Sequence, residues 1–357
     1  MIFLRRFLAL ILATISIISL CGCKNQGGII DLTYFNTAVH IETHDKPISE
    51  NTLLLVKQAL SAFESDFSTN ATNSLINRFN DAETGSTFNL TERESEVISQ
   101  SKRSYLFTDG LFNPAVYPLV KLWGFSPYSY TANYTPPTDA QIQNALNLCN
   151  FDQALFDSEN KILTKAGDVK LDLSGLVKGL CADVVAKILK DAGHSSGYVN
   201  IGGSSLNLLK VSSLGIRHPE KAGDSIISIN TEKYSDLSIS TSGDYERYYT
   251  DKDGNKYCHL INPFTGKTAN TCVRSATVIG VDGALGDAIT TALCLCEYSL
   301  AKIDNQLLNL SHKILSAYPN AMIFIVYSNE QTKLLLTNKK QGEDFTLNDT
   351  QYSVINI

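Results

Sequence analysis

Residues 169–193 read VKLDLSGLVKGLCADVVAKILKDAG, and the rest of the chain is organised around this stretch. Its first five residues alternate between apolar and polar side chains, which predicts a short strand over 169–173. The chain then turns at Ser174-Gly175 into an amphipathic helix, which we expect to end at Gly193 because glycine commonly terminates helices. The stretch therefore predicts a strand that leads directly into a helix N-terminus.

The start of this predicted helix is a candidate binding site for an anion. The first turn of a helix leaves backbone N–H groups unpaired and carries a partial positive charge, so phosphate binds there readily. Asp172 precedes the turn, Gly175 lets a ligand approach the backbone, and Lys178 lies one turn into the helix. An ordinary strand and helix with surface charges fits the same residues, so the choice depends on the neighbouring segments.

The composition is that of an acidic globular protein. The 357 residues allow one large domain or two smaller ones. A hydrophobic content of 43% with 18% charged residues is typical of a chain that buries a sizeable core. The net charge is −6 and the sequence pI is about 5.6, so the chain lacks the basic field of nucleic-acid-binding proteins. We therefore expect no nucleic acid among its partners.

The N-terminus has the pattern of an export signal. Arg5 and Arg6 precede an apolar run over 7–20, and the run closes with Leu20-Cys21-Gly22-Cys23, which resembles the bacterial lipobox. We expect a lipoprotein signal peptide over 1–22, lipid attachment at Cys23 and a short spacer over 23–30. The protein would then be anchored by lipid at the extracytoplasmic face of the bacterial cytoplasmic membrane. An uncleaved transmembrane anchor is the alternative, although the apolar run is short for a span.

The remaining cysteines allow two interpretations. Outside the cytoplasm Cys258 and Cys272 could close a short disulfide loop. Cys294 and Cys296 lie two apart on a predicted helix and point to different faces, so they should not bond to each other or form half of a metal site. Buried free thiols are the interpretation that we favour.

The other segments are predicted to form capped helices and short strands. Two capping boxes, Thr91-x-x-Glu94 and Thr138-x-x-Gln141, predict helix starts. The expected elements are a single strand over 32–42, a helix over 49–63, a polar turn-rich segment over 67–80, helices over 91–107 and 139–148, a strand over 197–209 interrupted at Gly202-Gly203, strands over 226–229 and 237–241, a hairpin turn at Asp253-Gly254, a strand over 274–281, helices over 286–296 and 304–316, and paired strands over 321–327 and 332–337.

Two further places carry candidate chemistry. Asp287 and Thr291 are four residues apart on a predicted helix, so a carboxylate and a hydroxyl share one face and could both bind a divalent cation through oxygen. An acidic residue that complements the helix dipole would look the same. His259 stands in YCHLINPFTGK, and a histidine beside apolar residues is more often structural than catalytic.

Seven segments in order resemble one known family. They are SLINRFN (74–80), GLFNPAVYPLVKLWGF (110–125), LDLSGLVKGL (171–180), NIGG (200–203), TSGDYERYY (241–249), HLINPFTG (259–266) and DAITTAL (287–293). Together they resemble the motifs of the ApbE family, the FAD:protein FMN transferases, over nearly the whole predicted mature chain. Each segment is weak evidence by itself, but their common order is strong evidence.

This resemblance implies both a fold and an activity. The fold would be α+β, a single ApbE-like (T-fold-like) domain over 31–357 in which helices cover antiparallel sheets, with a cleft between two lobes. The enzyme would cleave FAD with Mg²⁺ or another divalent cation, attach FMN to a Thr or Ser hydroxyl of an extracytoplasmic acceptor protein and release AMP. The acceptor would carry an Asp-Gly-x-Thr/Ser-x-Ala-Thr type of target sequence.

The resemblance also implies roles for individual residues. His259 would be the general base, and Lys178 would steady the pyrophosphate charge. The metal would be held by Asp287 and Thr291, the backbone carbonyl of Gly175 and an oxygen of Thr290. FAD would lie against Phe35, Asn70, Leu111, Phe112, Asn113, Asp172, Lys178 and Ile261.

Five positions depart from the family pattern. Phe35 replaces Met, Asn70 replaces an aromatic residue, Asn113 and Asn262 replace Asp, and Ser174 replaces Gly. The loss of an aromatic surface at position 70 should weaken FAD retention and could favour hydrolysis to FMN and AMP. Two other functions therefore stay open, a metal-dependent FAD pyrophosphatase and a non-catalytic flavin-binding lipoprotein. A solute-binding lipoprotein of a transporter fits the ordered motifs poorly.

Overall fold

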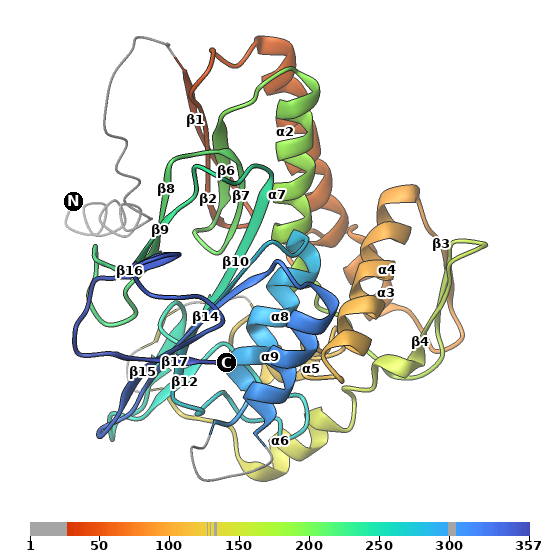
Figure 1. Cartoon of the computed structure of the whole chain (residues 1–357). Helices are drawn as coiled ribbons and strands as arrows, with labels where there is room; N and C mark the ends of the chain where they lie inside the picture. Colours follow the sequence, from red (N-terminus) through yellow and green to blue (C-terminus); the bar gives the residue numbers. More distant parts are fainter. Residues whose placement is uncertain (1–26, 127, 129, 132–133, 299–304) are drawn as a thin grey trace, which may run out of the picture.

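The structure is a computed structural model, which describes residues 27–126, 128, 130–131, 134–298 and 305–357 (Figure 1). The predicted signal peptide and lipidation site Cys23 lie outside the described residues. No helix in the described part combines the length and the apolar content of a membrane span. The six cysteines from Cys149 to Cys296 are free thiols, in line with the interpretation that we favoured.

A nine-stranded sheet forms the centre of the molecule. Neighbouring strands are antiparallel except for the last pair, which is parallel. The strand order is β1 (Gly28–Tyr34), β2 (Thr37–Thr43), β6 (Gly197–Ile201), β7 (Ser205–Lys210), β10 (Leu237–Gly243), β13 (Val273–Ile279), β14 (Met322–Ser328), β15 (Lys333–Thr337) and β17 (Ser353–Asn356).

Helices cover one face of this sheet, and a smaller sheet covers part of the other (Figure 1). The helices are α2 (Glu50–Phe67), α3 (Leu75–Asp81), α4 (Glu92–Phe107), α5 (Tyr117–Leu122), α6 (Asp139–Leu146), α7 (Ser174–Asp191), α8 (Gly283–Leu295) and α9 (Gln306–Ala317), with a 3-10 turn at Phe151–Gln153. The smaller sheets are β16 (Phe345–Leu347) with β9 (Ser225–Asn230) and β8 (Ser213–Arg217), β3 (Thr87–Asn89) with β5 (Ile162–Lys165) and β4 (Ala154–Asp157), and β11 (Tyr248–Thr250) with β12 (Lys256–Cys258).

The α+β class is confirmed, and both predicted capping boxes open helices, α4 and α6. The single strand predicted over 32–42 is wrong, because the chain forms a hairpin of β1 and β2 there. Phe35 and Asn36 make the turn with φ of 55° and 54°. That backbone conformation is unfavourable for Phe, and the Phe35 N–H is held by Glu64 Oε1 at 2.6 Å.

The strand predicted over 169–173 is also wrong, although the helix after it is confirmed. This segment joins no sheet, because a side chain takes the place of a strand partner. The Asn80 amide accepts from Leu171 N–H at 2.6 Å and donates to the Leu171 carbonyl at 2.9 Å. The Asp172 N–H donates to the Pro114 carbonyl at 2.8 Å. The alternation of apolar and polar residues over 169–173 therefore reflects the burial of the apolar side chains, although the segment forms no β-ladder.

The segment 67–80, predicted as polar and turn-rich, contains the short helix α3. Ser74 accepts from the Asn77 N–H at its start. At its end the buried Lys165 donates to the carbonyls of Phe79, Asn80 and Ala82 at 2.8–3.1 Å. The last carbonyls of a helix lack partners within the helix, so a lysine from a distant strand completes α3.

α7 and α8 cross at two glycines. A Cβ on Gly179 would lie 2.0 Å from the Gly283 carbonyl oxygen, and one on Gly283 would lie 2.2 Å from the Gly179 carbonyl oxygen. Two carboxylates bridge the crossing reciprocally. Asp287 of α8 accepts from the Gly179 N–H at 2.8 Å, and Asp183 of α7 accepts from the Gly283 N–H at 2.6 Å. The crossing therefore fixes the two helices in register.

Gly179→Ala should lower the free energy of unfolding by more than about 3 kcal/mol, because the new methyl group meets backbone that cannot rotate away. Urea unfolding followed by circular dichroism measures this change. Lys187→Ala, on the exposed face of the same helix, is the control and should change stability by less than about 0.5 kcal/mol. A Gly179→Ala variant as stable as the parent would contradict the tight crossing.

Candidate active site

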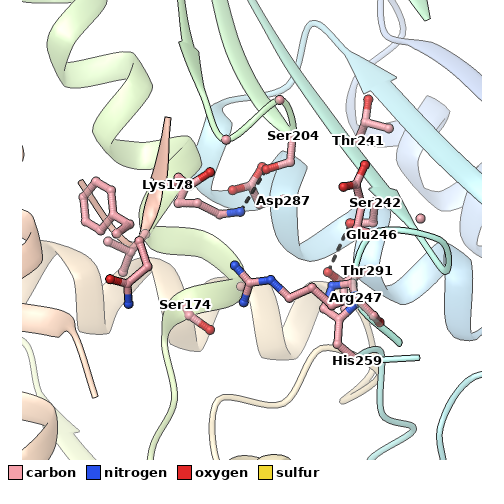
Figure 2. A pocket seen from close by; sticks show the side chains of 18 of the residues that line it. Ser174, Lys178, Ser204, Thr241, Ser242, Glu246, Arg247, His259, Asp287 and Thr291 are labelled. Atoms are coloured by element: carbon pink, nitrogen blue, oxygen red, sulfur yellow. Dashed lines mark hydrogen bonds between the residues drawn. The ribbon is translucent and has the colours of Figure 1, made fainter. Parts of the chain in front are cut away.

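A single large cleft collects most of the candidate residues. Its volume is about 2480 Å³, several times the roughly 300–1,000 Å³ of a small-molecule site. It runs past the N-terminus of α7, the middle of α8 and the ends of β6, β7 and β10 (Figure 2). The predicted site residues that line it are Phe35, Asn70, Leu111, Phe112, Asn113, Asp172, Gly175, Lys178, His259, Ile261, Asp287 and Thr291.

Thr290, the remaining predicted residue, lies behind the cleft wall and is fully buried. Its hydroxyl donates to the Asp287 carbonyl at 3.1 Å and lies 2.9 Å from the Ser242 hydroxyl. In this structure Thr290 therefore supports the helix around Asp287, while Thr291 faces the cleft.

Asp287 is a buried carboxylate with several donors around it. It accepts from the Gly179 N–H at 2.8 Å, from the Ser205 hydroxyl at 2.8 Å and from the Ser240 hydroxyl at 2.7 Å. Burial raises the pKa of this carboxyl to about 6, and Lys178 and the donors oppose the rise. A bound cation would stabilise the negative charge of this buried carboxylate.

The donor set around Asp287 fits a hard divalent cation. The cleft offers the Asp287 carboxylate, the Thr291 hydroxyl and the backbone of Gly175, and Mg²⁺ prefers oxygen ligands. Gly175 lies in the first turn of α7 and lines the cleft, so its carbonyl is close to the same space. The described residues contain no group of three or more His, Cys, Asp or Glu side chains that could hold a metal ion together.

Two cationic side chains, Lys178 and Arg247, line the same cleft. Lys178 Nζ donates to the Ser204 hydroxyl at 2.9 Å, and burial, with Arg247 adding to it, lowers the pKa of Lys178. Arg247 extends from beside His259 toward the Lys178 side of the cleft (Figure 2). A lysine and an arginine on one wall give the cleft a region that attracts phosphate.

His259 is oriented by the backbone. Its N–H and its Nδ1 both face the Arg247 carbonyl, at 3.0 and 3.3 Å. A carbonyl oxygen only accepts, so Nδ1 carries the proton and Nε2 keeps a lone pair. Burial, and then the positive charges of Arg247 and Lys178, lower the pKa of His259 to about 3. The imidazole is therefore a neutral base at any physiological pH.

Two of the departures from the family pattern form turns. Asn113 donates to the Cys149 carbonyl at 3.0 Å and accepts from the Ala115 N–H at 2.8 Å, so both ends of its amide are used. Asn262 accepts from the N–H groups of Phe264 and Thr265 at 2.9 and 3.2 Å. An aspartate could make the bonds of Asn262, but it could not donate as Asn113 does.

Four residues of this site are not among those predicted from the sequence: Gly179, Ser205, Ser240 and Arg247. Arg247 lies in the segment TSGDYERYY, where it is the one basic residue, beside the acidic Asp244 and Glu246. The two serines are ordinary strand residues in sequence, and only the pairing of β7 and β10 brings them together beneath Asp287.

Comparisons with known proteins agree on one family. The family model described as "ApbE family" matches residues 35–309. The FAD:protein FMN transferase of Escherichia coli K12 is 30% identical over 257 residues, which cover 69% of this chain and 71% of that protein. The protein of the same name from Vibrio cholerae is 29% identical over 293 residues, covering 79% and 86%.

Solved structures show the same fold. The flavin transferase ApbE from Vibrio cholerae aligns with a TM-score of 0.71 at 22% identity, over 87% of this chain and 97% of that one. The ApbE protein from Thermotoga maritima aligns with a TM-score of 0.71 at 26% identity, over 85% and 94%.

The imidazole of His259 should remain neutral at pH 5, because its pKa lies well below the ordinary value of 6.5. NMR titration of the histidine ring protons, with His259→Gln to assign the signal, measures this pKa. Arg247→Met should raise the pKa without restoring 6.5, since burial is the larger cause. Lys252→Met, a change at an exposed charge, is the control and should leave it unchanged. A pKa of His259 near 6.5 in the unmodified protein would contradict this effect of desolvation and neighbouring positive charge.

Proposed function

The chain belongs to the ApbE family, and from this we propose that it is an FAD:protein FMN transferase. It cleaves the pyrophosphate of FAD, joins the FMN phosphate to a Thr or Ser hydroxyl of an acceptor protein and releases AMP. The observation that carries the proposal is the meeting, in one cleft, of an oxygen-rich cation site at Asp287, the cations Lys178 and Arg247, and the neutral base His259.

Each residue has a task in this reaction. Lys178 and Arg247 hold the pyrophosphate and spread its negative charge. His259 Nε2 accepts the proton of the acceptor hydroxyl as its oxygen forms a bond to the FMN phosphorus. The bond from that phosphorus to the bridging oxygen breaks, and AMP leaves with that oxygen. A divalent cation bound by Asp287, Thr291 and the Gly175 carbonyl would neutralise charge on the phosphates.

We also propose that the enzyme works at the extracytoplasmic face of the cytoplasmic membrane, held by lipid at Cys23. The lipobox-like sequence Leu20-Cys21-Gly22-Cys23 supports this location. The acceptors would then be proteins exposed on the same side of the membrane.

The proposal is tested by incubating the protein that begins after Cys23 with FAD, Mg²⁺ and a soluble domain that displays the Asp-Gly-x-Thr/Ser-x-Ala-Thr sequence. Mass spectrometry of the domain should show a gain equal to one FMN phosphoester. Asp287→Ala should abolish the gain and the release of AMP, because the cation site is lost, while the circular dichroism spectrum stays unchanged. AMP without a mass gain would indicate a pyrophosphatase, and tight FAD binding with neither product would indicate a flavin-binding protein.

His259→Ala should slow transfer by about 10² to 10⁴, the usual range for loss of a general base. FAD affinity, measured by flavin fluorescence, should change by less than about threefold, because the proposed role of His259 concerns the acceptor hydroxyl. The matched control is His218→Ala, since His218 lies outside the cleft and bonds Asp349. Equal losses of FAD binding and transfer in His259→Ala would show that His259 is structural.

A further inference from the structure

β8 is an edge strand that faces the cleft. The small sheet has the order β16, β9, β8, so β9 is the only strand that pairs with β8 in the described part of the chain. Four consecutive residues of β8, 214–217, line the cleft. The side chains of Leu214 and Ile216 are buried in the core between the two sheets, so the cleft meets β8 mainly along its backbone.

The register shows which backbone groups are available. The Thr231 N–H donates to the Ser212 carbonyl at 3.0 Å, and bonded pairs alternate along an antiparallel ladder. Leu214 and Ile216 are therefore bonded to β9, while the N–H and C=O groups of Ser213 and Gly215 point to the free edge. Within the described part of the chain these outward groups have no hydrogen-bond partner. Such an edge is a template for another strand.

Beyond β8 the outer face of the large sheet is uncovered by the small sheet and is polar. The core between the sheets reaches Tyr198 of β6 but includes no residue of β1 or β2. There, Glu42 accepts from the Tyr198 hydroxyl at 2.9 Å, and His40 lies 2.7 Å from Asp31. All four of these residues also line the cleft. We call the space bounded by the Gly215 edge and by Asp31, His40, Glu42 and Tyr198 the β8 groove.

The β8 groove leads to the proposed base. Arg217, at the end of β8, forms an ion pair with Glu246 at 3.2 Å. Glu246 precedes Arg247, whose carbonyl fixes the tautomer of His259. A chain lying along β8 would therefore run toward His259 at one end.

We propose that the β8 groove binds an extended segment of the acceptor protein, which pairs with the free edge of β8 as an added strand and presents its hydroxyl to His259. This inference rests on the proposed function. Edge pairing takes its affinity from main-chain hydrogen bonds and its selectivity from the side chains that face the neighbouring surface. The polar floor at His40, Glu42 and Tyr198 favours hydrogen-bonding side chains over apolar ones. The cleft volume of about 2480 Å³ leaves room for such a segment beside a bound dinucleotide.

Gly215→Pro tests the pairing, because proline removes the outward N–H of an edge strand without removing a bond to β9. Gly215→Ala is the matched control, since it adds a side chain but keeps the N–H. With FAD, Mg²⁺ and the domain that displays the Asp-Gly-x-Thr/Ser-x-Ala-Thr sequence, the KM for that domain should rise about tenfold or more in Gly215→Pro. The KM for FAD and the rate of AMP release without acceptor should match those of Gly215→Ala.

Equal acceptor KM values for the two variants would overturn the docking site and leave the proposed function standing. Failure of the unmodified enzyme to transfer FMN to the domain would overturn the proposed function, and the docking site with it. If Gly215→Pro does not fold, the docking site is tested instead by backbone amide hydrogen exchange of the unmodified protein, with and without the acceptor domain. Saturation with the domain should slow exchange at Ser213 and Gly215 but leave Leu214 and Ile216, already bonded to β9, unchanged. Unchanged exchange at Ser213 and Gly215 would overturn the proposal.

Discussion

The site depends on the contact between α7 and α8 at Gly179 and Gly283. Because neither residue has a side chain, the two backbones approach closely enough for Asp287 to accept from the Gly179 N–H and for Asp183 to accept from the Gly283 N–H. The first bond does more than join two helices. It also orients the carboxylate on which the proposed cation site is centred. The hydrogen bond from the Gly179 N–H to Asp287 therefore holds the two helices together and also orients a carboxylate of the proposed active site.

The electrostatics of the cleft follow from that placement. Asp287 is buried, so its carboxylate is costly unless donors and cations surround it, and the structure supplies two serine hydroxyls, an N–H and Lys178. Lys178 and Arg247 in turn disfavour a proton on His259, which burial already disfavours. One arrangement thus keeps the carboxylate available for a cation and the imidazole available as a base. Burial and neighbouring charges are enough to shift the pKa of both Asp287 and His259.

The sequence predicted the α+β class, most helices and twelve of the residues that line the cleft, because capping boxes and ordered motifs are local signals. It could not predict the contacts that depend on tertiary pairing. The segment 169–173 alternates like a strand, yet its partner is the Asn80 side chain, more than eighty residues earlier in the chain. The hairpin at Phe35 and Asn36 lacked a glycine, so no turn signal was present. Ser205 and Ser240 gained a role only when β7 paired with β10.

The way the small sheet packs on the large sheet explains how a protein substrate would reach the cleft. Among the described residues, the small sheet covers the outer face of the large sheet only as far as β6, which leaves the polar face of β1 and β2 open beside β8. β1 begins at Gly28, five residues after Cys23. With Cys23 lipidated as proposed, an extended chain spans at most about 18 Å over those five residues, so this end of the sheet lies near the bilayer. An anchored enzyme with its open groove at that end suits acceptors that are themselves held at the membrane, since tethering raises the effective concentration of each for the other.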